Sequence, residues 1–140
     1  RDEVRSAGEL PRLVFADIML PHQGPAREAG EVALRMVEAG VDAVGIHLQA
    51  DARRANPKLI EDAYLGDVAR AVFERIGKAV PVQVVGGLSI AEAKSLAQAG
   101  LRAFVISGNM GLPDGDARYN LPPAEIQRLV VDFIAEVSGR

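Results

Sequence analysis

The stretch VPVQVVGGLSIAEAKSLAQAGLRAFVIS, residues 80–107, carries the pattern that decides the fold. Short runs of branched and aromatic apolar residues at 80–85 and 103–107 predict two buried strands. The segment 89–99 between them predicts a helix, which begins at a Ser-x-x-Glu capping box and ends at Gly100. A strand, a helix and a second strand in this order predict two parallel strands joined by a right-handed crossover.

The same alternation runs along the whole chain. We predict strands at 13–19, 43–47, 80–85 and 103–107, and helices at 27–39, 57–76, 89–99 and 122–137. A polar loop is expected between the second strand and the second helix. The fold class is therefore α/β, with four consecutive β–α units and a parallel sheet. We expect one domain over residues 1–140, in which the polar segment 1–11 frays.

Two phrases in the sequence resemble each other. EAGVDAVGI (38–46) and QAGLRAFVI (98–106) each contain a helix end, a glycine, a short turn and a strand. Shared cap chemistry at helix ends explains this likeness, and an internal repeat of two units each is the alternative.

Two architectures contain four β–α units in a row. One is a free-standing sheet with helices on both faces, as in flavodoxin-like folds. The other is half of a (β/α)₈ TIM barrel, because a full barrel needs at least about 200 residues and the chain has 140. The sequence begins at Arg1 rather than Met, so we expect either processing or a longer parent protein. A half barrel would pair with itself, as a homo-oligomer, or with a complementary half.

Composition excludes several classes of protein. The chain has no Cys and only two His, which excludes a disulfide scaffold, a thiolate zinc site and a multi-histidine metal site. The net charge is −3 and no basic stripe carries aromatics, so we expect no nucleic-acid partner. No apolar run is long enough to cross a membrane and no signal peptide pattern occurs. The expected location is the cytoplasm.

Three ionisable residues stand near the predicted carboxyl ends of strands, where parallel sheets bind ligands. Asp17 lies within an apolar strand, so we expect its carboxylate to be paired or to face a polar site. His47 ends the second strand and can carry a proton near neutral pH, although a hydrogen-bonded structural histidine is the alternative. Asp51 follows four residues later, where it would orient the imidazole, hold a substrate hydroxyl or cap the next helix.

Two glycine-containing segments follow the last two strands. Gly86-Gly87 comes after the third strand and Ser107-Gly108-Asn109 after the fourth. Glycines let a ligand approach the backbone, and successive free amides bind anions, so these residues are candidates for a phosphate site. The alternative is that both segments are tight turns without a ligand.

The segments LVFADIMLP (13–21), AGVDAVGIHLQAD (39–51) and VPVQVVGGLSIAEAKSLAQAGLRAFVISGNMG (80–111) together resemble the C-terminal half of the 3-hexulose-6-phosphate synthase family. That family belongs to the orotidine-phosphate-decarboxylase-like barrels, as does 3-keto-L-gulonate-6-phosphate decarboxylase. The resemblance covers about residues 12–112. Asp17, His47, Asp51, Gly86, Gly87 and Gly108 fall on the family pattern in this order.

The resemblance implies a phosphosugar lyase, an aldolase or decarboxylase active as part of a complete barrel. It implies that His47 is a proton carrier for an enediolate, that the glycine-containing strand ends hold the sugar phosphate, and that magnesium stabilises the enediolate. The family's Asp-x-Lys-x-x-Asp motif is absent here, so its usual metal ligands are not in this chain. Asp17 therefore aligns with the fifth barrel strand. A non-catalytic sugar-phosphate-binding or assembly module is the alternative function.

Overall fold

The computed structural model describes residues 13–21, 24–56, 64–86, 88–106 and 121–139. Within these residues the strands are β1 (Phe15–Leu20), β2 (Ala43–Leu48), β3 (Val82–Val85) and β4 (Ala103–Val105). The helices are α2 (Ala26–Glu38), α3 (Ala50–Ala55), α5 (Tyr64–Ile76), α6 (Ile90–Gln98) and α7 (Pro123–Ser138). The α/β class with consecutive β–α units is confirmed. The segment expected to fray, 1–11, lies outside the described residues.

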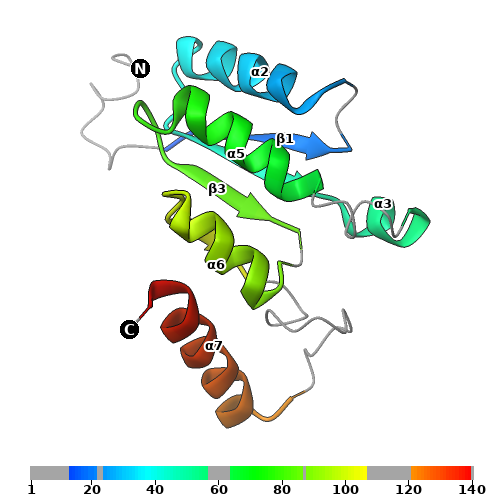
Figure 1. The fold of residues 1–140 in the computed structure, drawn as a ribbon, viewed down its shortest axis with the longest axis vertical. Coiled ribbons are helices and arrows are strands. Elements are labelled where there is room, and N and C mark those ends of the chain that lie inside the picture. The colour runs from blue at the N-terminus through cyan, green and yellow to red at the C-terminus, as the bar shows by residue number, and fades with distance from the viewer. Residues whose placement is uncertain (1–12, 22–23, 57–63, 87, 107–120, 140) are drawn as a thin grey trace.

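The strand order distinguishes the two architectures. All strands are parallel, and they lie in the sheet in chain order, β1-β2-β3-β4. Because each crossover therefore moves in the same direction, the connecting helices fall on the same face of the sheet. The long helices α2, α5, α6 and α7 indeed form one row, each packed against the next (Figure 1). A flavodoxin-like sheet reverses its strand order and carries helices on both faces, so this fold is half of a (β/α)₈ barrel.

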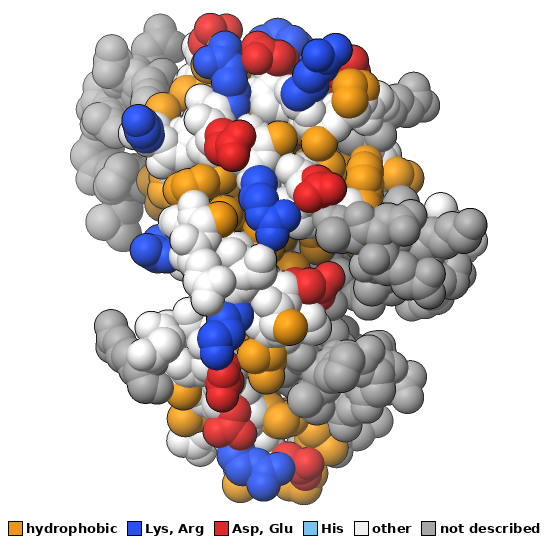
Figure 2. Space-filling model, viewed as in Figure 1, with side chains coloured by type: hydrophobic (Ala, Val, Ile, Leu, Met, Phe, Trp, Pro, Cys, Tyr) orange, Lys and Arg blue, Asp and Glu red, His pale blue; other side chains and the backbone are white. Residues whose placement is uncertain are grey.

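The core lies between the sheet and this row of helices. Alternate side chains of each strand face the helices, and Ile18, Leu20, Val44, Ile46 and Val84 are all buried there. The helices contribute buried residues such as Ala33, Val72, Leu96 and Phe133 to the same cluster. Ion pairs join neighbouring helices at the surface, from Arg75 to Glu31 at 2.9 Å and from Lys94 to Glu136 at 3.1 Å. Figure 2 shows acidic and basic side chains interspersed over this helical face.

The predicted caps are present. Ser89 Oγ accepts a hydrogen bond from the Glu92 amide at 3.2 Å, and Glu92 Oε2 accepts from the Ser89 amide at 2.7 Å. Helices α2 and α6 both end before a glycine with left-handed backbone, Gly40 (φ 95°) and Gly100 (φ 107°). Each of these glycines donates its N–H to the carbonyl three residues back, and the next residue donates to the carbonyl five residues back. The segments 38–46 and 98–106 thus share the same cap geometry.

Some element boundaries differ from the prediction. The expected polar loop after β2 contains the short helix α3, because Ala and Arg are strong helix formers and fill most of Ala50–Ala55. The fourth strand ends at Val105, earlier than predicted. Helix α5 is described from Tyr64 onward, and the predicted first part of this helix, 57–63, lies outside the described residues.

Candidate functional site

The candidate site lies on the sheet face that points away from the helices. Asp17, Gly45 and Gln83 are register partners across β1, β2 and β3, so they form one row on this face. Met19, His47 and Val85 form the next row towards the carboxyl ends of the strands. In a complete barrel this face is the interior, whose carboxyl-terminal mouth holds the active site.

Asp17 and His47 lie close to each other across β1 and β2. Asp17 Oδ2 is 3.9 Å from His47 Nδ1, a distance that permits charge attraction and is too long for a direct hydrogen bond. Their side chains are 48% and 37% exposed, respectively. A pair this open to water adds little to stability, because solvent screens it. The pair lies on the sheet face that the described helices leave uncovered.

Gly45 makes room for the Asp17 carboxylate. A Cβ built on Gly45 would overlap Asp17 Oδ1 and lie 3.0 Å from its Cγ. The side chain of Asp17 therefore lies across the β2 backbone at the point where β2 has no side chain. Sequence reasoning missed Gly45, although a glycine inside an apolar strand is a known sign of close approach by another group. It also missed Gln83, which could have been noticed as the one polar residue in the apolar run at 80–85.

The structure places the three ionisable candidates at different positions along the strands and the helix that follows β2. Asp17 is the third of six residues in β1, so it lies at mid-strand rather than at the carboxyl end. His47 is the fifth of six residues in β2, as expected for a residue near the strand end. Asp51 lies exposed in the first turn of α3, a favourable place for a negative charge. The carboxylate found in ion-pair range of His47 is that of Asp17.

Gly86 has a structural role of its own. Its φ is +138°, and a Cβ there would lie 2.7 Å from Leu48 Cβ and 2.9 Å from Leu48 O. Glycine is therefore required for the end of β3 to pack against the end of β2. The other predicted phosphate-binding residues, Gly87, Ser107, Gly108 and Asn109, lie outside the described residues.

The capping box limits where an anion can bind near α6. The Ser89 amide already donates to the Glu92 carboxylate, which also places a negative charge at the start of the helix. The Ser89 amide is therefore already engaged within the chain.

The described residues do not fit a magnesium site. Among them no group of three or more His, Asp and Glu side chains comes together. Asp17 brings a single carboxylate and its neighbour His47 a nitrogen, whereas Mg²⁺ prefers several oxygen ligands in octahedral geometry.

Comparisons with known proteins give no relative. No protein-family model, curated protein or solved structure matches this chain. Within the described part of the chain, the helices are too short or too polar to cross a membrane.

Proposed function

We propose that this chain contributes half of the active site of a sugar-phosphate lyase, an aldolase or decarboxylase of the hexulose-phosphate synthase type. The observation that carries the proposal is the approach of Asp17 to His47 on the open sheet face, where Gly45 leaves room for the carboxylate. Both lie on the face that forms the interior of a (β/α)₈ barrel, and His47 is near its carboxyl-terminal mouth. The substrate class comes from the sequence resemblance.

His47 is the proposed proton carrier. The bond that breaks joins the carbon next to the sugar carbonyl to its outer neighbour, which leaves as formaldehyde, with loss of its hydroxyl proton, or as carbon dioxide. The bonding electron pair stays on the carbon next to the carbonyl as an enediolate, and that carbon then takes up a proton. Imidazole can deliver this proton because it gains and loses one near neutral pH. Asp17 stands on the Nδ1 side of the ring, which leaves Nε2 for the substrate. Asp17 is thus proposed to position the imidazole.

The phosphate is proposed to bind the backbone amides that follow β3 and β4. Gly86 packs against Leu48, the residue after His47, so the end of β3 is held beside the proton carrier. A sugar phosphate bound near the end of β3 would therefore lie close to His47.

Thermal unfolding of the whole chain with hexulose 6-phosphate tests this proposal. A ligand at about 100 times its Kd stabilises the folded state by about 2.7 kcal/mol, which raises Tm by roughly 10 °C in a domain of this size. The unphosphorylated hexulose should have little effect. Failure of the sugar phosphate to raise Tm, or an equal rise with the unphosphorylated hexulose, would overturn the proposal.

Variants separate binding from stability. His47→Gln and Asp17→Asn should lose most of the ligand-induced shift, while their Tm without ligand stays close to that of the native chain, because an exposed pair contributes less than about 1 kcal/mol. Asp67→Asn is the matched control, since Asp67 also pairs with a neighbour, Arg70 at 3.3 Å, but lies on the helical face. This control should keep the full shift.

A further inference from the structure

The exposed apolar side chains of the described residues gather at the two lateral ends of the fold. At one end, large and well-exposed hydrophobic residues lie on β1 or just before it. At the other end, such residues lie on α7. They are Leu13 (66%), Val14 (55%), Phe15 (55%), Met19 (43%), Val131 (55%) and Ile134 (55%). Figure 1 shows α2 and β1 at the top of the row and α7 at the bottom. Exposed apolar residues clustered in this way indicate surfaces that another chain covers.

The outer sides of β1 and β4 have no partner strand in the part of the chain that the structure describes. Among the described residues β1 pairs with β2 alone, and β4 pairs with β3 alone. A fifth parallel strand placed beside β4 would extend the sheet, just as each strand from β1 to β4 lies parallel to the one before it. The free edge of β1 in a second copy offers such a strand, so the two edges are complementary.

The helical layer repeats the same interface along the sheet. Helix α2 packs on both β1 and β2, and α5 packs on both β2 and β3. Each of these helices thus covers two consecutive strands. By the same rule α7 would cover β4 and a strand beyond it, where the described part of the chain supplies none.

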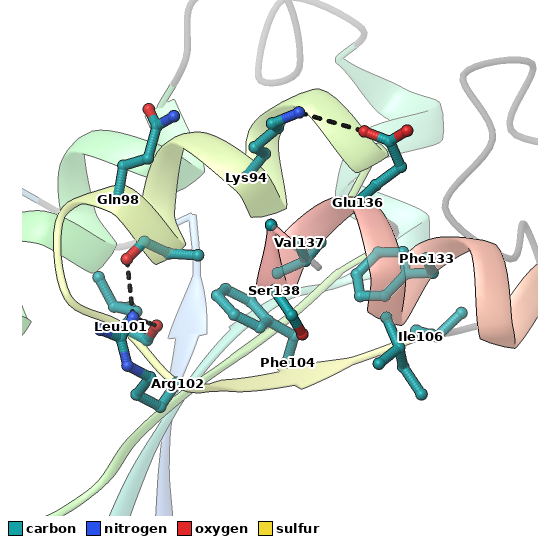
Figure 3. Close-up of a pocket in the computed structure, with 13 residues that line it drawn as sticks. Lys94, Gln98, Leu101, Arg102, Phe104, Ile106, Phe133, Glu136, Val137 and Ser138 are labelled. Carbon is teal, nitrogen blue, oxygen red and sulfur yellow. Dashed lines mark hydrogen bonds and ion pairs between the residues drawn. The ribbon is translucent and has the colours of Figure 1, made fainter.

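A cavity lies where that strand would pack. It has a volume of about 760 Å³ and lies between α6, β4 and α7. Figure 3 shows Phe104 and Ile106, on and just after β4, lying near Phe133 and Val137 of α7. Leu101, which precedes β4, also lines it, so the cavity reaches the amino end of this strand.

Val14 of a second copy is the residue that we expect to pack into this cavity. It precedes β1 at a register position that shares a face with Ile18, which is 3% exposed, yet Val14 itself is 55% exposed. Its backbone is fixed by Asp42, whose amide donates to the Val14 carbonyl at 2.8 Å. An apolar residue at the amino end of β1 would meet the amino end of β4 when the two strands lie side by side.

We propose that a second copy of this chain closes an eight-stranded barrel, with β4 of each copy beside β1 of the other. The described strands of two copies number eight, as in a closed (β/α)₈ barrel, and a two-fold axis uses both free edges at once. Face-to-face stacking of the sheets would bury Asp17 and His47 without water, so edge pairing is the favoured contact. Both Asp17–His47 pairs then line one interior. This inference does not depend on the proposed activity.

The mass of the chain in solution tests the proposal. Light scattering coupled to gel filtration should give a molecular mass twice that of the 14.9 kDa chain at micromolar concentration. Val14→Asp and Ile134→Asp should each give a monomer that keeps its helical circular dichroism. Ala91→Asp, at an exposed position in α6 away from both edges, should leave the dimer intact. A monomeric native chain, an open-ended polymer, or association with a different chain only would overturn the proposal.

Cross-linking keeps the test decisive if an aspartate variant fails to fold. The chain has no cysteine, so introduced thiols report on one contact. A mixture of V14C and I134C should form an intermolecular disulfide on mild oxidation, because Val14 of one copy lies under α7 of the other. Either variant alone should remain uncross-linked, since equivalent residues lie on opposite sides of the barrel. Equal cross-linking in the single-variant samples would contradict the arrangement.

Discussion

At the scale of single residues, Gly45 determines where the Asp17 carboxylate can lie in the candidate site. It is the register partner of Asp17, and its missing Cβ leaves the space that the carboxylate fills. Any side chain at this position would push Asp17 away from the β2 backbone and change its distance to His47.

We therefore expect Gly45→Ala to destabilise the chain by about 1 kcal/mol, at the low end for overpacking because Asp17 is partly exposed and can rotate. In a chain that already carries Asp17→Ala, Gly45→Ala should lower the free energy of unfolding much less, because the carboxylate atoms that the new methyl group would overlap are gone. Urea unfolding of the two single variants and the double variant measures this coupling. Strictly additive free energies of unfolding would show that Asp17 does not occupy the space above Gly45.

Asp17 and His47 could each be predicted from the sequence as polar residues on apolar strands. Their proximity could not be predicted, because it depends on the register between β1 and β2, which periodicity does not report. For Asp51, four residues after His47, the sequence left three roles open: orienting the imidazole, holding a substrate hydroxyl or capping the next helix. The carboxylate of Asp17, thirty residues before His47 in the chain, lies in ion-pair range of its imidazole.

At the scale of elements, the ends of α2 and α6 use the same cap and differ in their surroundings. A Cβ on Gly40 would meet nothing within 4 Å, whereas a Cβ on Gly100 would lie 2.9 Å from Phe73 Cε1. Both glycines have positive φ, so both disfavour any other residue.

Gly40→Ala should lower the free energy of unfolding by about 1 kcal/mol, from backbone strain alone. Gly100→Ala should cost more, because the new methyl group also presses on Phe73. Chemical denaturation of both variants gives the comparison. The order would be wrong if the two substitutions cost the same, which would mean that Phe73 moves aside freely.

Such caps were predictable because their chemistry is local: a capping box or a glycine acts on its own turn of helix. The short helix α3 was missed because a six-residue segment gives too little periodicity to separate a helix from a polar loop.

At the scale of the whole molecule, the strand order decides between the two architectures. A flavodoxin-like sheet and a half barrel share the same local pattern of strands, helices and caps, so the sequence left both open. They differ only in which strands pair, and the order β1-β2-β3-β4 leaves one sheet face uncovered by the described helices. That open face is where Asp17 and His47 meet.

The assignment of this face as the binding site is tested most directly by nuclear magnetic resonance, through amide shifts of the labelled chain on addition of hexulose 6-phosphate. The largest shifts should fall at His47 and Gly86, with smaller shifts at Asp17 and Gln83, and should weaken in His47→Gln. Shifts confined to the cavity beside Phe104 and Phe133, or no shifts at all, would contradict a sugar-phosphate site on the open face.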